Sequence, residues 1–326
     1  MTGSAGRIGR WQVEALRNAG YDVRTFDRAA QGKEKSKGEH FPGDLRDISA
    51  VRQAVQGMDA VLHLGALSSD RAGPAEDVLT INVQGTWNVL LACVEAGVER
   101  LVYFSSVNAL GCVGGHRAAG YLPIDDAYPR HPLSPYQLSK HLSEEACRSF
   151  SDRHGLVTVC LRPVFVTDPA HYDRWRAPRQ QGSSEWAKVE YWAYVDVRDV
   201  CDAALLGLTA ENVTHDAFLL TADDTTQETP TAELVDRYYP DTPWKPAPPA
   251  QGKQDPTPKA QRQTPNARSG ALLSPQAEPE AYRAARDIYL AANPHRSLMD
   301  CSHAKQVLGW QPRHSWRATA QPEETP

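Results

Sequence analysis

Thr2-Gly-Ser-Ala-Gly-Arg-Ile-Gly9 follows a single methionine, and this stretch decides the fold that we expect. Glycines at this spacing are typical of the turn between the first strand and first helix of a dinucleotide-binding α/β fold. One makes the tight turn, one lets the backbone approach a diphosphate, and one lets the helix pack on the sheet. We therefore expect the cofactor to contact Gly3, Gly6, Arg7, Ile8 and Gly9. Glycines also punctuate ordinary turns, so the prediction depends on the residues that follow.

The first half of the chain alternates helix and strand signals. We expect helices over residues 10–19, 48–56 and 82–96, and strands over residues 21–26, 60–64 and 100–104. This alternation predicts an α/β fold, a doubly wound parallel sheet with helices on both faces. The ligand crevice of such a sheet lies at the carboxyl ends of its strands.

Asp27 ends the strand expected over 21–26, roughly 20 residues after the glycines, where a carboxylate can accept hydrogen bonds from the ribose hydroxyls of a dinucleotide. A carboxylate there favours NAD, because a 2′-phosphate would meet a like charge. Arg7 and Arg28 leave NADP open, since either guanidinium could pair with that phosphate. Alternatively, Asp27 only starts a loop.

The composition limits the partners. The chain has 326 residues, of which 41% are hydrophobic, and a net charge of -5, so no global basic field is present to hold nucleic acid or an anionic membrane. We expect a small-molecule substrate. No stretch reaches the ~18 apolar residues of a membrane span, and no signal peptide is recognisable, which predicts a cytoplasmic protein. The six cysteines lack the spacing of a metal site, so we expect reduced thiols and no metal.

A chemical constellation follows in the middle of the chain. Tyr136 and Lys140 lie four residues apart, so on a helix they share a face, and the ammonium would favour the phenolate form of the tyrosine. Ser106, after the strand expected over 100–104, could hydrogen-bond the substrate oxygen whose proton Tyr136 exchanges during hydride transfer. We therefore expect Ser106, Tyr136 and Lys140 to be catalytic. A Tyr/Lys pair alone is also typical of a solvated helix face, and the order of the signals favours the catalytic interpretation.

These motifs together resemble the extended short-chain dehydrogenase/reductases, the NAD-dependent epimerase/dehydratase family. The resemblance rests on Thr2–Gly9, Gly43-Asp44-Leu45, His63-Leu64-Gly65-Ala66, Asn82–Thr86, Ser105-Ser106, Ser134–Lys140, Leu161-Arg162-Pro163 and Tyr194–Val200. Residues 300–312 look like the closing helix and turn of that family. The resemblance covers nearly the whole chain.

The resemblance implies a Rossmann cofactor domain over residues 1–161 and a smaller, discontinuous substrate cap over residues 162–326. It implies that Asp44 and Leu45 flank the adenine and that Gly65 and Ala66 line the cofactor diphosphate and ribose. Lys140 would also bind the nicotinamide ribose. Relatives commonly form homodimers through the helices that begin near Asn82 and Tyr136, and we expect the same here.

The chain departs from the family at its start and at Asp168. The family's first strand ends in Val-Thr-Gly, and here Met1 stands where that valine would be, so the strand is missing. A GTG valine codon read as a start would give this sequence, and we expect a misplaced start rather than a true loss. Asp168 stands where the family commonly has glycine, which alters the loop over the substrate.

The region after Asp168 also differs. The segment over residues 171–190 is shorter than the corresponding loop of relatives that bind nucleotide sugars. This difference argues against a nucleotide sugar as the substrate. The segment contains Arg174, Arg176, Arg179 and Lys188, which either hold an anionic group or form a solvated basic loop. We place Arg174 and Arg176, with Ser105 and Asn108, near the substrate. Residues 244–279 are rich in proline and predict a mobile insertion, with a helix resuming over residues 280–292.

Three functions remain open. The first is hydride transfer at a hydroxyl or carbonyl carbon of a sugar or sugar derivative, as in a sugar-nucleotide epimerase. The second is a dehydrogenase acting on a smaller free substrate such as a uronate, and the third is a catalytically idle NAD-binding protein. Family dehydratases usually carry an Asp-Glu pair beside the catalytic Ser or Thr. Val107-Asn108-Ala109 follows Ser106, which argues against dehydration.

Overall fold

The computed structural model describes residues 1–29, 39–176, 187–245 and 279–318. Its centre is a parallel sheet made of β1 (Thr25–Asp27), β2 (His40–Pro42), β3 (Ala60–His63), β4 (Arg100–Phe104), β5 (Val157–Pro163) and β8 (His215–Leu220). The strands run in the order β3-β4-β5-β8, with β1-β2 as a separate pair, and every pairing is parallel. The expected doubly wound parallel sheet is confirmed.

The first three residues join the two parts of the sheet. Thr2 makes parallel bridges to Phe26 of β1 and to His63 of β3. The Thr2 amide donates to the Leu62 carbonyl, and the Gly3 amide donates to the Phe26 carbonyl, each at 2.9 Å. These residues therefore occupy the carboxyl end of the position that the resemblance assigns to a first strand.

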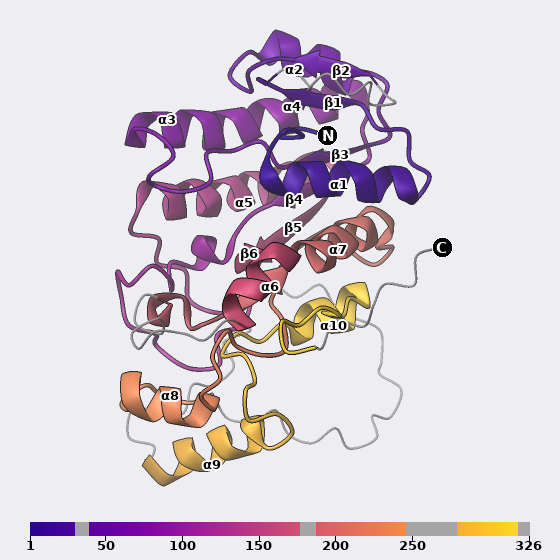
Figure 1. The fold of residues 1–326 in the computed structure, drawn as a ribbon. Helices are drawn as coiled ribbons and strands as arrows, with labels where there is room; N and C mark the ends of the chain where they lie inside the picture. Colours follow the sequence, from indigo (N-terminus) through magenta and orange to yellow (C-terminus); the bar gives the residue numbers. More distant parts are fainter. Residues whose placement is uncertain (30–38, 177–186, 246–278, 319–326) are drawn as a thin grey trace, which may run out of the picture.

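Helices cover both faces of the sheet (Figure 1). On one face lie α2 (Ile48–Val55), α4 (Gly85–Ala96) and α5 (Pro135–His154), and on the other lie α1 (Arg7–Asn18) and α7 (Val197–Thr209). Alternate residues of β4 supply the two cores, because successive side chains of a strand point to opposite faces. Leu101 and Tyr103 pack with α4 and α5, whereas Val102 and Phe104 pack with α7.

Several boundaries differ from those expected. Strand β1 begins at Thr25 rather than Tyr21, whose side chain is 41% exposed and whose amide donates to the Leu16 carbonyl at the end of α1. Helix α1 begins at Arg7, directly after the glycine turn. The helix expected over 82–96 begins earlier, as α3 (Ala75–Leu79) and a π-helical turn, η1 (Thr80–Gln84), lead into α4.

The remaining elements form a cap at the end of the molecule away from β1 and β2. They are β6 (Phe165–Thr167), β7 (Tyr194–Asp196), α6 (Pro169–Arg176), α8 (Thr231–Tyr238), α9 (Pro279–Leu290) and α10 (Ser302–Leu308). Figure 1 shows α8 and α9 lying side by side at the tip of the cap. Strand β5 continues past residue 161 and β8 pairs with it, so segments after residue 161 complete the main sheet.

The proline-rich region is ordered at its edges. Trp244, expected to begin the mobile insertion, is instead buried at 4% exposure, and its neighbour Lys245 donates its amide to the Leu122 carbonyl. The bulky indole therefore belongs to the core. Helix α9 begins at Pro279, which confirms the helix expected over 280–292. The rest of the expected insertion, residues 246–278, and Arg179 lie outside the described residues.

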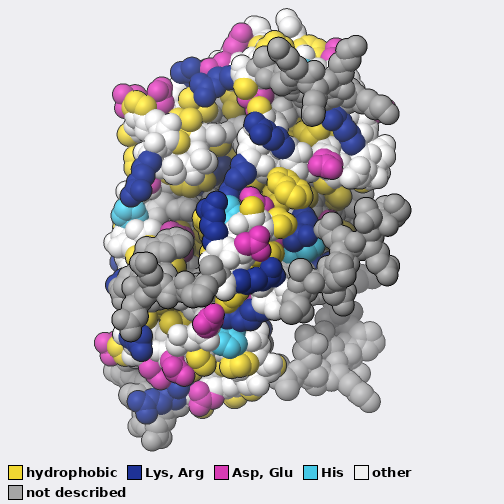
Figure 2. Space-filling model, in the orientation of Figure 1, with side chains coloured by type: hydrophobic (Ala, Val, Ile, Leu, Met, Phe, Trp, Pro, Cys, Tyr) yellow, Lys and Arg dark blue, Asp and Glu magenta, His cyan; other side chains and the backbone are white. Residues whose placement is uncertain are grey.

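The described ranges also bear on membranes and metals. No helix in them is long and apolar enough to cross a membrane. Nor do they contain a group of three or more His, Cys, Asp or Glu side chains arranged to hold a metal ion. On the face shown in Figure 2, basic and acidic side chains are interspersed, so neither sign dominates there.

Candidate active site

The glycine turn packs directly against the end of β3. Gly3 has φ +70°, and a Cβ there would lie 2.6 Å from the Gly65 amide nitrogen. A Cβ on Gly9 would lie 2.1 Å from the Gly3 carbonyl oxygen. Any side chain at these positions would force the backbone apart. No acidic residue or side-chain cap occupies the first turn of α1, which leaves its positive end available to an anion.

A cavity of about 340 Å³ opens at this turn, along the carboxyl ends of β1, β2 and β3. It is lined by Gly3, Ala5, Gly6, Phe26, Asp27, Arg28, Ala29, Gly43, Asp44, Leu45, Leu64, Gly65, Ala66, Leu67 and Ile81. Most of the residues expected to contact the cofactor thus meet in one cavity. Arg7, Ile8 and Gly9 do not line it. The Arg7 guanidinium instead donates to the Val166 carbonyl of β6, joining the turn to the cap.

The acidic residues of this cavity are held by their neighbours. Asp27 accepts hydrogen bonds from the Ala5 amide at 2.9 Å and from the Ala29 amide at 3.0 Å, one on each carboxylate oxygen. Each oxygen keeps a lone pair that could accept a ribose hydroxyl. Asp44 receives two hydrogen bonds from the Arg46 guanidinium, and this contact lowers the pKa of its carboxyl.

The residues present fit a dinucleotide. Gly3 and Gly65 leave no room for side chains beside the turn, so bare backbone faces the place where a diphosphate would lie. Leu45 packs against Gly65 at the wall of the cavity, since a Cβ on Gly65 would lie 2.8 Å from the Leu45 Cδ1. The carboxylate of Asp27 lies in the same cavity, where it can receive a ribose diol.

The expected catalytic residues come together at the end of β4. Ser106 caps the short helix η2 (Val107–Leu110), and its hydroxyl accepts hydrogen bonds from the Asn108 amide and side chain, both at 3.2 Å. A further hydrogen bond joins Ser106 to the Tyr136 phenol. Tyr136 lies in the first turn of α5, which begins with a capping box formed by Ser134 and Gln137.

Lys140 lies one turn further along α5. Its Nζ donates to the Phe104 carbonyl at 2.7 Å and lies 5.9 Å from the centre of the Tyr136 ring. Burial raises the pKa of Tyr136 to about 12 and lowers that of Lys140 to about 8. The phenol is therefore protonated at neutral pH, and the ammonium bonds to the backbone rather than directly to the phenol.

The residues expected near the substrate are only partly brought together. Asn108 lies beside Ser106, but the Ser105 hydroxyl donates to the buried Glu144 carboxylate at 2.6 Å. Arg176 donates to the Trp316 and Ala318 carbonyls at 2.9 and 2.8 Å, so it anchors the C-terminal segment. Arg174 is exposed on α6.

The sequence interpretation missed two residues next to this site. Asp70 accepts a hydrogen bond from the Tyr136 amide at 2.7 Å, and its charge adds to the increase in the Tyr136 pKa. Nothing in the local pattern around Asp70 indicates this contact. Glu144 binds the Arg162 guanidinium at 2.7 and 2.9 Å behind the site. Its position four residues after Lys140 could have indicated that it shares the inward face of the helix.

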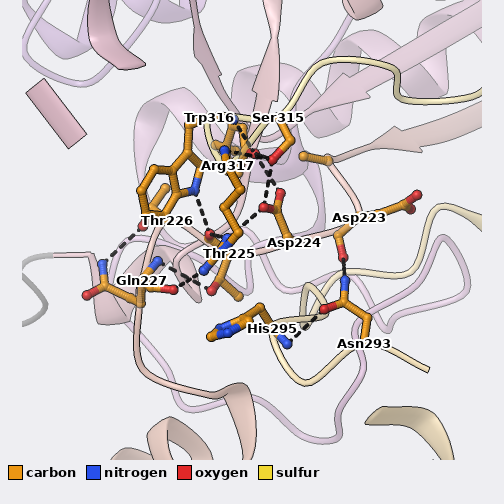
Figure 3. Close-up of polar contacts among 12 residues, drawn as sticks. Asp223, Asp224, Thr225, Thr226, Gln227, Asn293, His295, Ser315, Trp316 and Arg317 are labelled. Atoms are coloured by element: carbon orange, nitrogen blue, oxygen red, sulfur yellow. Dashed lines mark hydrogen bonds and ion pairs between the residues drawn. The ribbon is translucent and has the colours of Figure 1, made fainter. Parts of the chain in front are cut away.

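The C-terminal segment of residues 315–317 packs against the loop of residues 223–227 in the cap (Figure 3). The Arg317 guanidinium points into the loop of residues 223–227, where it donates to the Asp224 carboxylate at 2.6 Å and to the Thr225 carbonyl at 2.7 Å. Ser315 also donates to Asp224, and the Trp316 indole donates to Thr225. The end of the described chain therefore fixes the loop that follows β8.

Known proteins resemble this chain in sequence and in fold. A model described as the NAD dependent epimerase/dehydratase family matches residues 1–219. The uronate dehydrogenase of Pseudomonas syringae pv. tomato is 34% identical over 163 residues, which are 50% of this chain and 57% of that protein. A putative UDP-glucose 4-epimerase of Methanocaldococcus jannaschii is 31% identical over 168 residues, which are 50% of this chain and 53% of that protein. The matched regions span little more than half of these curated relatives.

Among solved structures, a short-chain dehydrogenase/reductase superfamily protein from Agrobacterium tumefaciens with bound NAD has the same fold. Its TM-score is 0.64 at 24% identity, and the alignment covers 97% of this chain and 92% of that protein. The family model covers well over half of the 326 residues. The chain therefore belongs to the NAD dependent epimerase/dehydratase family.

Proposed function

We propose that the protein is an NAD-dependent oxidoreductase that transfers a hydride at a hydroxyl or carbonyl carbon of a sugar or sugar derivative. The observation that carries the proposal is the contact between Ser106 and the Tyr136 phenol, with Lys140 one helical turn away. A catalytically idle NAD-binding protein would have no need of this set. NAD, when bound, supplies a nicotinamide ring that exchanges a hydride with the substrate carbon.

The side chains handle the proton. In the reducing direction, the protonated Tyr136 phenol donates to the substrate carbonyl oxygen, while Ser106 orients that oxygen by a hydrogen bond. In the oxidising direction, the phenolate takes the hydroxyl proton. Because the pKa of Tyr136 is raised to about 12 by burial, oxidation should become faster as the pH rises. Lys140, one helical turn from Tyr136, donates from its Nζ to the Phe104 carbonyl and lies where it could bind the ribose beside the nicotinamide.

We propose a free sugar acid, such as a uronate, as the substrate, and a nucleotide sugar as the second candidate. The match to a uronate dehydrogenase favours the first, as does the short segment between Asp168 and Glu190. The match to a putative UDP-glucose 4-epimerase favours the second. The two differ in cofactor handling, because an epimerase keeps its NAD through both hydride transfers whereas a dehydrogenase releases NADH.

The test is to purify the protein, measure NAD retained after gel filtration, and then follow NADH formation with glucuronate or galacturonate. Exchangeable NAD with uronate-dependent NADH formation supports the dehydrogenase. Retained NAD with interconversion of UDP-glucose and UDP-galactose supports the epimerase. Absence of NAD binding would overturn the proposal as a whole.

We also propose that the protein works as a cytoplasmic homodimer paired through α4 and α5. Trp87 of α4 is 49% exposed, and Leu138 and Leu142 of α5 are 36% and 40% exposed. Large apolar side chains exposed on two neighbouring helices are typical of a surface that another chain covers. The six cysteines are buried and unpaired, which is compatible with a reducing compartment.

A further inference from the structure

His63 is buried at the carboxyl end of β3, between the glycine turn and α4. Its Nδ1 lies 2.6 Å from Thr2 Oγ1, and its Nε2 lies 3.0 Å from Thr86 Oγ1. Both partners are hydroxyls, which can donate or accept. The protonation of the ring must therefore be worked out from the other contacts of these hydroxyls.

The number of available hydrogens determines which group donates and which accepts in each of these hydrogen bonds. Thr86 Oγ1 lies 2.5 Å from the Asn82 carbonyl oxygen, which can only accept, so the Thr86 hydroxyl donates its one hydrogen there. The Nε2 of His63 must then be the donor to Thr86. Burial, with a smaller contribution from Lys140, lowers the pKa of His63 to about 3, so the ring is neutral and carries a single N–H. Its Nδ1 is therefore bare and accepts the hydroxyl hydrogen of Thr2.

The consequence appears at the cofactor cavity. With its hydrogen directed to His63, the Thr2 oxygen presents lone pairs to the Gly65 amide, which donates to it at 3.1 Å. The Gly65 nitrogen is also the atom that a Cβ on Gly3 would meet at 2.6 Å. The orientation of the Thr2 hydroxyl thus sets how closely the two glycine segments approach.

The same chain of contacts continues to the catalytic helix. The Asn82 side chain accepts from the Leu67 amide at 2.8 Å and donates to the Ser139 hydroxyl at 3.0 Å. Ser139 precedes Lys140 in α5. Buried polar groups connected in this way hold one another in a single arrangement.

We infer that His63 is a positioning residue for the cofactor cradle. As the Nε2–H tautomer it fixes the Thr2 hydroxyl, whose oxygen holds the Gly65 amide against the glycine turn. The inference rests on the proposed function in one respect, namely that this cradle holds NAD. The hydrogen bonds themselves belong to the protein without cofactor.

Two substitutions separate this role from simple filling of space. In His63→Asn, the amide oxygen lies near the position of Nδ1 and can still accept from Thr2. In His63→Gln, the longer side chain places its amide near the position of Nε2, so it retains Thr86 and loses Thr2. The two amides are similar in polarity, which makes each the control for the other.

The first measurement is hydrogen exchange at the Gly65 amide in the protein without NAD. We expect His63→Gln to exchange about two- to ten-fold faster than wild type, as for loss of one neutral hydrogen bond, and His63→Asn to stay close to wild type. The dissociation constant for NAD should weaken by a similar factor in His63→Gln alone. Nitrogen-15 NMR of the wild-type ring should show a protonated Nε2 and a bare Nδ1.

A ring protonated at Nδ1 would overturn the inference, and so would equal exchange at Gly65 in both variants. The NMR measurement on wild type decides the tautomer even if a variant fails to fold. Should wild type fail to bind NAD while the exchange difference persists, the proposed function fails and the positioning role stands. Should wild type bind NAD with no exchange difference, the positioning role fails and the proposed function stands.

Discussion

Tyr136 is the residue on which the proposed chemistry depends, and its neighbours set its charge. Burial raises its pKa to about 12, the hydrogen bond from Ser106 opposes that increase, and the Asp70 carboxylate adds to it. The phenol therefore carries its proton at neutral pH. It is ready to act as the acid in the reducing direction, where a substrate carbonyl gains a proton.

We expect Tyr136→Phe to lower turnover by a factor of about 10² to 10⁴ while its affinity for NAD stays nearly unchanged, because only the exchangeable proton is removed. Steady-state kinetics and NAD titration measure both effects. Tyr103→Phe is the control, since the Tyr103 ring also faces the Lys140 Nζ, at 4.9 Å, and should retain most turnover. A Tyr136→Phe enzyme with more than about a tenth of wild-type turnover would contradict the assignment.

Asp27 determines the expected choice between NAD and NADP. If its carboxylate receives the ribose diol, wild type should prefer NAD, and Asp27→Asn should narrow that preference by removing the negative charge that a 2′-phosphate would meet. Asparagine is a better test than alanine because its carbonyl oxygen can still accept one of the amide bonds from Ala5 and Ala29. Titration with both cofactors measures the preference, and equal wild-type affinity would refute the role.

Residues near the site differed in how well the sequence could place them. The glycine turn, Asp27, Tyr136 and Lys140 follow local rules, because each is defined by a turn, a strand end or a helical spacing. Asp70 follows no such rule, since it reaches the Tyr136 amide across 66 residues of chain through a loop. Ser105 was expected near the substrate, but the buried Glu144 carboxylate holds its hydroxyl, a contact that only the packed helix and sheet create.

At the scale of elements, α5 carries most of the proposed site. Its capping box fixes where the helix begins, and this places Tyr136, Lys140 and Glu144 at successive turns of one face. Burial by itself raises the pKa of Glu144, but the Arg162 guanidinium lowers it overall, so the carboxylate is charged. Arg162 is 1% exposed and also contacts Asp126 at 3.0 Å.

We expect Glu144→Gln to reduce the free energy of unfolding by about 3 to 5 kcal/mol, because it leaves the buried Arg162 short of a counter-charge. Urea denaturation measures the change. Glu145→Gln is a matched control on the same helix, since Glu145 is 35% exposed and its ion pairs should contribute about 1 kcal/mol or less. Equal losses in the two variants would show that burial of this ion pair does not matter.

Sequence patterns predict the boundaries of helices and strands less well than their presence. The helices expected over 10–19, 48–56 and 280–292 and the core strands β3 and β4 were predicted from their apolar patterns. Strand β1 was expected from Tyr21, but the Tyr21 amide donates to the Leu16 carbonyl, so this residue belongs to the end of α1 rather than to the sheet. The π-helical turn at Thr80–Gln84 was also not predicted; within it the Asn82 side chain accepts from the Leu67 amide, a contact that periodicity does not indicate.

For the whole molecule, we expect a dimer at micromolar concentration. The Trp87 ring of α4 packs edge-on against the buried Phe150 ring of α5, with the ring centroids 4.9 Å apart, so the two helices are in contact at this surface. Sedimentation equilibrium should give about twice the 35.9 kDa mass of one chain. Leu142→Glu should shift the protein toward monomer, whereas Ile288→Glu on α9 should not, although Ile288 is more exposed, at 64% against 40%. A single-chain mass for wild type would contradict the dimer.

Within the described residues, residues 1–3 connect the β1-β2 pair to β3. A cavity of about 610 Å³ lies beside the residues that precede β1, β2 and β3, and it is lined by Arg17, Gly20–Arg24, Glu39 and Met58. The side-chain amide of the buried Gln12 has no partner within the described residues. Buried polar groups without partners cost about 1 to 3 kcal/mol each, a large part of a typical stability.

A variant extended before Met1 by about five apolar residues, a usual strand length, should therefore melt at a higher temperature and bind NAD more tightly.

The extended variant should also lose one pH dependence of its stability. Burial lowers the pKa of the Met1 amino group from 8.0 to about 5, so between these values the unfolded chain binds more protons than the folded one. Stability of the chain that begins at Met1 should consequently fall, by at most about 4 kcal/mol, as the pH drops from 8 to 5. An extended chain has a peptide bond in place of that amine and should lack this contribution to the pH dependence. Thermal melts of both forms across pH 5 to 8 make the comparison. If the two forms melt at the same temperature and show the same pH dependence, the cavity is not a strand position, and this account of the sheet is wrong.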